Sequence, residues 1–166
     1  SFDVTKPDLR DWRAVVDQAL AKPERTVKVG VVAKYLDNAD TYMSVLEAIR
    51  AAAWANGVGV DISWIDAPKL EAATDDEVAA TLQAVDGIVV PGGFGSRGVE
   101  GKIRAAQFAR ERKIPYFGIC FGMQLAVIEA ARHLGGLPKA TSSEFGPSDQ
   151  AVIGLMTEWM KDNQLE

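Results

Sequence analysis

The sequence of 166 residues has very few reactive or cross-linking side chains: one cysteine, Cys120, and one histidine, His133. A single cysteine excludes an internal disulfide, and a lone thiol is typical of a reducing compartment, so we expect a cytoplasmic protein. Long apolar runs are absent as well. The longest, such as residues 29–33 and 51–55, fall far short of the roughly 18 residues that span a bilayer.

An excess of charge of one sign is also lacking. The 18 Lys and Arg residues and 23 Asp and Glu residues give a net charge of −5 and are interspersed along the chain. This pattern is typical of a solvated enzyme surface, and duplex nucleic acid is not an expected partner. With 48% hydrophobic residues at this length, the composition predicts one globular domain with a sizeable core.

Strands and helices alternate along most of the sequence. An amphipathic helix is expected within residues 1–23, which we interpret as a linker that precedes a domain of residues 24–166. The predicted strands are 26–33, 58–64, 87–90, 114–119 and, less clearly, 151–156; the predicted helices are 41–56 with Asp40 as N-cap, one after the capping box 74–77, 102–112 and 121–134. This alternation favours a mostly parallel sheet with helices on both faces. We therefore expect an α/β fold, a flavodoxin-like three-layer sandwich.

A cysteine lies where the predicted strand 114–119 turns into the predicted helix 121–134. Residues 118–122 read Gly-Ile-Cys-Phe-Gly, the thiol counterpart of the G-x-S-x-G elbow, in which a tight turn exposes a nucleophile and flanking glycines avoid clashes. A helix N-terminus stabilises a thiolate, and its free N–H groups, chiefly that of Phe121, can donate to an oxyanion. A free cysteine is otherwise most often a small buried hydrophobe, but this turn favours a nucleophile.

A glycine-rich loop follows the predicted strand 87–90. Residues 91–101 contain five glycines, which let the backbone approach a ligand closely and leave N–H groups free for an anion. The loop is not a Walker A phosphate loop, because Lys102 is followed by Ile103 rather than by Ser or Thr. A mobile turn without a chemical role is the alternative. Since ligands of open α/β sheets bind beyond the carboxyl ends of the strands, we expect this loop and Cys120 to share one crevice.

Both loops resemble sequences of one enzyme family. Residues 91–93 and 118–124 match the P-G-G oxyanion strand and the nucleophile elbow of the class I, triad-type glutamine amidotransferases. Within that class, four segments resemble the glutaminase domain of the CTP synthase family: residues 34–48, 91–102, 117–124 and 143–145. The resemblance extends over nearly the whole chain from about Leu9, and it identifies the first helix as the linker from an ATP-dependent synthetase domain.

The resemblance implies a role for each site residue. Cys120 attacks the side-chain amide of L-glutamine and forms a glutamyl thioester, with the N–H groups of Gly93 and Phe121 as the oxyanion hole. Gly93 and Phe121 also line the glutamine site, where Gln124 and Glu144 hold the α-amino and α-carboxylate groups. The residue types alone leave alternatives open: Gln124 could form a hydrogen bond to a loop, and Glu144 could be a solvated carboxylate.

Further partners are implied by the same resemblance. Ammonia passes to the synthetase domain, which uses ATP and Mg to aminate UTP to CTP, while the glutaminase domain itself needs no cofactor and no metal. GTP is implied as an activator that binds near Arg97, although surface solvation is an equal explanation of that arginine. The whole enzyme is implied to be a homotetramer.

The sequence departs from the family pattern in two places. Phe121 stands where leucine is usual, which keeps the backbone donor but adds a bulkier ring. The His-x-Glu pair that supplies the base and its orienting acid has no counterpart in this sequence. His133 lies thirteen residues beyond Cys120 on the same predicted helix, about 20 Å away at 1.5 Å per residue. We expect it to balance the helix dipole rather than to act as the base.

The missing base leaves three hypotheses. The first is a glutaminase domain, incomplete at its C-terminal end and inactive alone. The second is a non-catalytic amidotransferase-like module for binding or assembly, and the third is another elbow-cysteine hydrolase or redox protein of the superfamily. Only the first explains why Gln124 and Glu144 accompany Cys120.

Overall fold

The central element of the fold is a parallel sheet of four strands. The structure, a computed structural model, describes residues 7–155, 160–161 and 164–165. Its strands are β1 (Thr26–Ala33), β2 (Gly59–Asp66), β3 (Gly87–Val90) and β4 (Tyr116–Gly118), in the order β2-β1-β3-β4 and all parallel. These are the strands that the sequence predicts, with ends that differ by up to two residues at β2 and β4, and β2 and β4 form the edges of the sheet.

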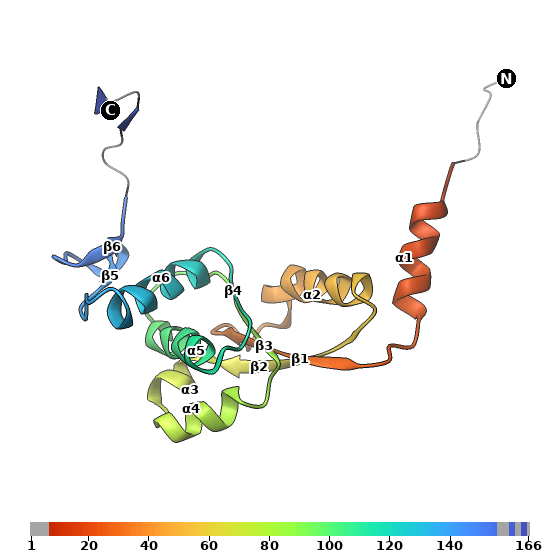
Figure 1. Ribbon diagram of the computed structural model, residues 1–166, viewed down its shortest axis with the longest axis horizontal. Helices are drawn as coiled ribbons and strands as arrows, with labels where there is room; N and C mark the ends of the chain where they lie inside the picture. The colour runs from red at the N-terminus through yellow and green to blue at the C-terminus, as the bar shows by residue number, and fades with distance from the viewer. Residues whose placement is uncertain (1–6, 156–159, 162–163, 166) are drawn as a thin grey trace.

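Helices cover both faces of this sheet (Figure 1). One face packs on α2 (Met43–Ala55), and the other packs on α3 (Ala67–Ala72), α4 (Asp75–Leu82) and α5 (Val99–Arg112). Successive β1 residues point to opposite faces: Val31 joins the cluster of Tyr42 and α2, whereas Val32 joins the cluster of α3, α4 and α5. The predicted α/β fold, a flavodoxin-like three-layer sandwich, is therefore confirmed.

A separate apolar cluster holds the helix that follows β4. Helix α6 (Phe121–His133) packs on α5 through Val99, Ile103, Phe121, Leu125 and Ile128. Behind it lie the short strands β5 (Thr141–Ser142) and β6 (Ala151–Ile153) and the 3-10 helix Ser143–Phe145. Of the predicted strand 151–156, the structure forms Ala151–Ile153, and Met156 lies outside the described residues. Two further short strands, β7 (Met160–Lys161) and β8 (Gln164–Leu165), pair antiparallel with each other.

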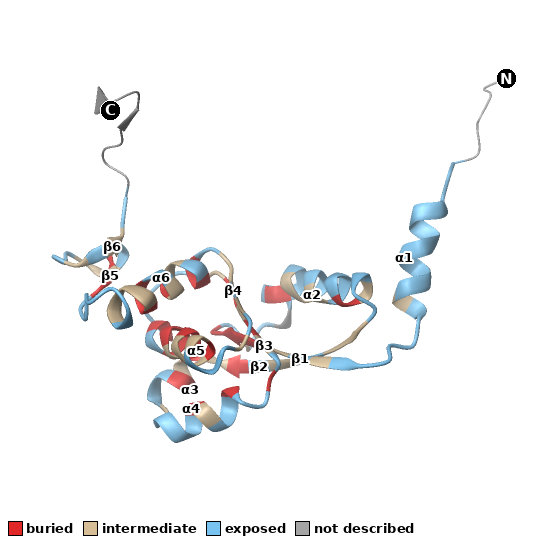
Figure 2. Cartoon of the chain, viewed as in Figure 1, coloured by how far each residue is buried: buried red, intermediate tan, exposed pale blue. Residues whose placement is uncertain are grey.

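Helix α1 (Arg10–Leu20) projects from the rest of the molecule (Figure 1). None of its residues is buried, and its apolar stripe is open to solvent, with Trp12 71% exposed (Figure 2). The predicted amphipathic helix is thus confirmed. Its interpretation as a linker, and the boundary between residues 1–23 and 24–166, stay predictions.

Three helices differ from the sequence predictions. The helix expected at 41–56 is divided, because Asn38 caps a 3-10 helix, Ala39–Tyr42, and α2 begins only at Met43; Asp40 as its N-cap was wrong. Helix α5 begins three residues earlier than predicted, after Gly98 in a left-handed conformation with φ 74°. Helix α3 was not predicted at all. Within the described residues, no helix is both long and apolar enough to cross a membrane.

Candidate active site

Cys120 occupies a strained turn between β4 and α6. Its backbone has φ 53° and ψ −110°, and it is the residue that immediately precedes α6. A positive φ is uncommon outside glycine and costs of order 1–3 kcal/mol. The side chain is exposed, so the thiol is presented to solvent rather than packed in the core. This is the geometry that the elbow motif predicts.

The two glycines of the motif are required by close backbone contacts. A Cβ on Gly122 would lie 2.0 Å from the carbonyl oxygen of Val90, and one on Gly118 would lie 2.5 Å from the nitrogen of Met123. The Tyr116 hydroxyl donates to the carbonyl of Gly122 at 2.8 Å. Burial raises the pKa of Tyr116, so this hydroxyl keeps the proton that it donates. These contacts fix the turn on which the thiol is carried.

The glycine-rich loop lies beside the thiol, as the sequence predicts. A Cβ on Gly92 would be 3.5 Å from Cys120 Cβ and 4.0 Å from its Sγ. The Ile119 N–H donates to Val90 at 2.9 Å, which joins the two loops at their roots. Within the described residues, no acceptor forms a hydrogen bond with the N–H of Gly93 or of Phe121. One free backbone donor therefore lies in the loop and another in the elbow.

Two buried lysines that the sequence analysis missed lie under the loop. The side chain of Lys102 on α5 is fully buried, and its Nζ donates to the Pro91 carbonyl at 3.1 Å. Lys34 follows β1, is 4% exposed, and donates from Nζ to the carbonyls of Phe94 and, at 3.0 Å, Gly95. A signal for Lys102 was present, since it lies three residues after the apolar Val99, on the buried side of the helix.

The pKa values of both lysines are lowered. Burial, with the nearby positive charge of Lys34, lowers the pKa of Lys102 to about 8. The pKa of Lys34 is also lowered, mainly by burial and then by the charge of Arg97, while Glu144 acts in the opposite direction. Desolvation disfavours the charged ammonium, which is the common cause.

The remaining predicted residues surround the same loop or the start of α6. The Gly95 N–H donates to Glu144 Oε1 at 3.3 Å, which brings the 3-10 helix Ser143–Phe145 to the loop. Arg97 donates to the carbonyl of Lys34 at 2.8 Å, and its guanidinium lies 5.6 Å from the Tyr35 ring centre. Gln124 is half-buried in the first turn of α6, where its N–H donates to the Cys120 carbonyl.

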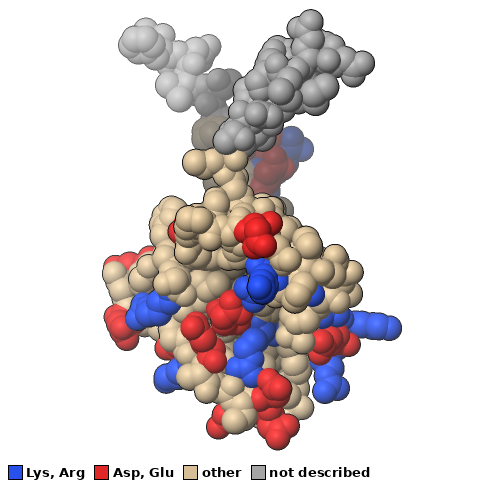
Figure 3. Space-filling view, turned by 90° about the vertical axis from the view of Figure 1, so that its left-hand side faces the viewer, with Lys and Arg blue, Asp and Glu red and all other residues tan. Residues whose placement is uncertain are grey.

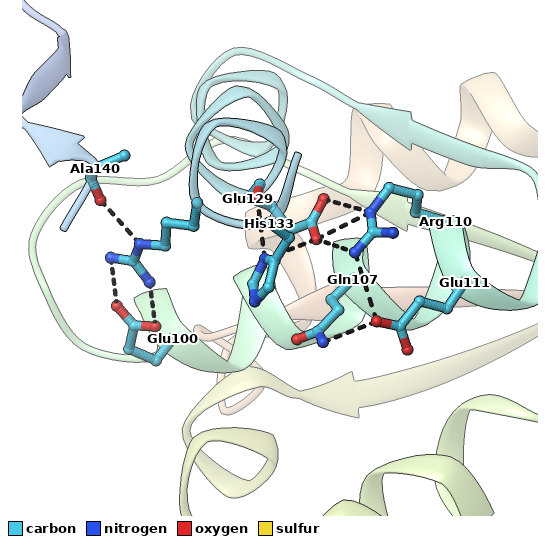
Figure 4. A network of polar contacts seen from close by, with 8 residues as sticks. Glu100, Gln107, Arg110, Glu111, Glu129, His133 and Ala140 are labelled. Carbon is cyan, nitrogen blue, oxygen red and sulfur yellow. Dashed lines mark hydrogen bonds and ion pairs between the residues drawn. The ribbon is translucent and has the colours of Figure 1, made fainter. Parts of the chain in front are cut away.

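His133 is not brought to the thiol. It lies in the last turn of α6, at the end opposite to Cys120, with Nδ1 3.0 Å from Oε1 of the buried Glu129 (Figure 4). Glu129 in turn accepts from Arg110 of α5 at 2.8 Å and 3.1 Å. The histidine therefore belongs to a network between α5 and α6.

The surface charge is mixed, as the sequence predicts. On the face that Figure 3 shows, acidic and basic side chains are interspersed.

Other features of the described residues do not point to a second site. No group of three or more His, Cys, Asp or Glu side chains in this part of the chain could hold a metal ion. A cavity of about 580 Å³ lies between α2 and the sheet. Its lining is mostly apolar, includes Val29, Ile49 and Phe117, and does not include Cys120.

Comparisons with known proteins agree with this geometry. Residues 38–159 match the family model described as "Glutamine amidotransferase class-I". The chain is 52% identical over 165 residues to a CTP synthase of Paramagnetospirillum magneticum, which covers 99% of this chain. It is 56% identical over 161 residues, 97% of this chain, to a CTP synthase of Rhodospirillum centenum. The chain spans only 30% and 29% of the lengths of these curated relatives.

A solved structure is similar in both sequence and fold. It is the Trypanosoma brucei CTPS glutaminase domain with bound acivicin, with a TM-score of 0.68 and 48% sequence identity. The match covers 72% of this chain and 46% of that chain.

Proposed function

Because this chain belongs to the class I glutamine amidotransferase family, we propose that it is the glutaminase part of a CTP synthase and that it acts on L-glutamine. The observation that carries the proposal is the exposed thiol of Cys120, held at positive φ beside the Pro91-Gly92-Gly93 loop. A buried structural cysteine needs neither the strained turn nor the free backbone donors next to it. Both features serve a nucleophile.

The proposed first half-reaction uses Cys120 as the nucleophile. The sulfur adds to the amide carbon of glutamine, and the negative charge moves to the carbonyl oxygen. The N–H groups of Gly93 and Phe121, which have no acceptor within the described residues, donate to that oxygen. Collapse of this intermediate, with transfer of the thiol proton to the departing nitrogen, expels ammonia and leaves a glutamyl thioester; in the second half-reaction water hydrolyses the thioester to glutamate and the free thiol.

Proton transfer in both steps requires a base, and no histidine lies at the thiol to supply it. His133, the only histidine, is held by Glu129 at the far end of α6. General-base catalysis needs contact at about 3 Å. We therefore propose that the chain alone forms the thioester slowly at best and has no normal turnover.

Substrate recognition is assigned to two polar side chains. Gln124 and Glu144 are proposed to bind the α-amino and α-carboxylate groups of glutamine, with Gly93 and Phe121 lining the same site. The bond between Glu144 and the Gly95 N–H supports this role, since it draws the carboxylate to the loop beside the thiol. Arg97, packed on Tyr35 at the outer side of that loop, is proposed to contact GTP as an activator.

The rest of the reaction is assigned to a separate synthetase domain. There ATP and Mg would activate UTP, and ammonia from this site would complete CTP. The relatives named CTP synthase are more than three times as long as this chain, which leaves room for such a domain. A cytoplasmic homotetramer remains our proposal for the whole enzyme.

Labelling with acivicin, a glutamine-like electrophile, tests the proposed function. The protein is incubated with acivicin, with and without excess L-glutamine, and the modified peptide is located by mass spectrometry. We expect modification at Cys120 that glutamine suppresses, and no modification of Cys120→Ser at that position. Labelling that glutamine does not slow would favour another elbow-cysteine enzyme, and no labelling would favour a binding module without this activity.

A further inference from the structure

We infer that Lys102 is a positioning residue of the oxyanion hole, because its buried ammonium joins the Pro91-Gly92-Gly93 loop to the ring of Phe121. The inference rests on the proposed function, which assigns the two oxyanion donors to Gly93 and Phe121. It adds a residue that does not touch the substrate and acts through both donors.

Lys102 contacts both halves of the oxyanion hole. Its Nζ donates to the Pro91 carbonyl at 3.1 Å and would lie 3.9 Å from a Cβ on Gly93. The same Nζ is 5.7 Å from the centre of the Phe121 ring. One ammonium thus holds the start of the loop and packs over the residue that follows the nucleophile. Misplacement of either donor by about 1 Å can cost 10²-fold in rate.

The cost of burying this amine argues for a specific role. Lys102 is 0% exposed, and a buried charge with few partners is unfavourable compared with an apolar side chain of similar size. Its described partners are one carbonyl and one aromatic face. Helix α5 could pack a methionine at this position more easily. Such an amine at a predicted oxyanion hole is typical of residues that tune a site.

The aromatic side chain of Phe121 fits this arrangement. Its ring lies 5.8 Å from Nζ of Lys34 and 5.7 Å from Nζ of Lys102. A cation is attracted to an aromatic face, more strongly when it is desolvated. An aliphatic side chain at this position would offer no such face. We infer that Phe121 stabilises the two ammonium groups under the loop.

The charge of Lys102 should make the site sensitive to pH near 8. The charged group that acts on it is Lys34 after β1, and Lys34 is in turn affected by Arg97 and Glu144 around the loop. With a pKa of about 8, Lys102 is an ammonium below that pH and a neutral amine above it. The ammonium is the form that donates most strongly to Pro91. The hydrogen bond that holds the loop is therefore expected to be strongest below pH 8.

Two alkylating probes separate positioning from general damage. A chloromethyl ketone analogue of glutamine reacts when the Cys120 thiolate displaces chloride, and its carbonyl oxygen occupies the oxyanion hole. Iodoacetamide alkylates the same sulfur by displacement of iodide and is too small to be oriented by the glutamine site. Both rates scale with the thiolate fraction. The rate with the chloromethyl ketone divided by the rate with iodoacetamide therefore reports how well the oxyanion hole is formed. The ratio is measured between pH 6.5 and 9.5, with folding checked by circular dichroism.

For Lys102→Met we expect the ratio to fall about tenfold at pH 7 and to lose its pH dependence, while the iodoacetamide rate is unchanged. Lys69→Met, at an exposed lysine of α3, is the matched control and should leave both rates as they are. In the unsubstituted protein the ratio should decline as the pH rises through about 8. Phe121→Leu should move this decline to lower pH, because the ammonium loses its aromatic partner.

Two results would overturn the inference. These are a Lys102→Met protein with an unchanged ratio, which includes equal losses with both probes, and a ratio in the unsubstituted protein that is flat across pH 8. The proposed function fails differently, since Cys120 of the unsubstituted protein would then ignore the glutamine analogue or would not be protected by glutamine.

Discussion

Gly122 is one of two glycines whose backbone leaves the least space for a side chain; the other is Gly101. It follows the exposed Cys120 by two positions and lies against the end of β3, where a Cβ would be 2.0 Å from the Val90 carbonyl oxygen. In the first turn of an exposed helix, alanine is ordinarily preferred over glycine by about 1 kcal/mol. Here the contact reverses that preference, because the helix must approach the strand backbone to aim the thiol outward.

We predict that Gly122→Ala destabilises the fold by about 2–3 kcal/mol, because the backbone of β3 or α6 must move apart. The measurement is urea denaturation followed by circular dichroism. Gly87→Ala is the matched control, since its Cβ would meet only ordinary contacts, 3.7 Å or more away. Equal stability losses for the two substitutions would contradict the prediction.

Residues whose role is local could be found from the sequence. Cys120 and its glycines follow from a five-residue pattern, and the structure forms that tight turn with a positive φ at Cys120. The buried Lys34 and Lys102 were missed, because burial of a charge depends on segments that are distant in sequence. Lys102 meets Pro91 only because α5 folds back over the end of β3.

At the scale of elements, the capping box of α4 is fully formed. The Thr74 hydroxyl accepts from the Glu77 N–H at 3.3 Å, and the Glu77 carboxylate accepts from the Thr74 N–H at 2.8 Å and from its hydroxyl at 2.9 Å. These bonds, the backbone one foremost, lower the pKa of Glu77. Two of the otherwise unpaired N–H groups at the start of the helix region are thereby satisfied.

Thr74→Ala is predicted to cost about 1 kcal/mol of stability at pH 7, from loss of the cap. Since the pKa of Glu77 is lowered from 4.5 by folding, its contribution is present above that pH and is lost as the pH falls through the lower, folded value. The difference between the two proteins should therefore shrink in acid. Denaturation at pH 7 and pH 3 measures it, with Thr81→Ala, in the last turn of the same helix, as control. A difference that does not change with pH would refute this account.

The elements themselves were largely predictable, and their ends were less so. Runs rich in β-branched residues mark β1 and β3 at their observed bounds, because such side chains favour strands. The six-residue α3 was missed, since it is too short for a helical period. Its signal was Asp66, which accepts from the Lys69 N–H as a cap, followed by Pro68 in the first turn.

At the scale of the whole molecule, α5 and α6 are joined by charge as well as by apolar packing. Glu129 of α6 is 2% exposed and accepts hydrogen bonds from both Nε and Nη2 of Arg110 of α5 (Figure 4). Arg132 and Glu100 form a second bridge between the same helices at 2.8 Å and 3.1 Å. Because α6 carries Cys120 at its start and α5 carries Lys102, this interface sets the relative position of the two.

Arg110→Met is predicted to destabilise the protein by about 2 kcal/mol, because Glu129 would keep its buried charge with His133 as its remaining partner. Guanidinium chloride denaturation is the measurement. Glu111→Gln removes the exposed, 3.5 Å partner of the same arginine and should change stability by less than about 0.5 kcal/mol. If both substitutions had the same small effect, the buried pair would not contribute as argued.

The layered α/β fold, the glycine-flanked cysteine elbow and the absence of a histidine near it could all be predicted from the sequence. These features follow from short-range patterns: apolar periodicity, turn residues and helix caps. The contact of Glu144 with Gly95, the burial of two lysines under the loop and the pairing of His133 with the buried Glu129 became visible only in the folded molecule. Glu144 and Gly95 are remote along the chain, and whether a polar group such as Lys102 or Glu129 is buried or solvated depends on the packing of other segments around it rather than on its neighbours in sequence.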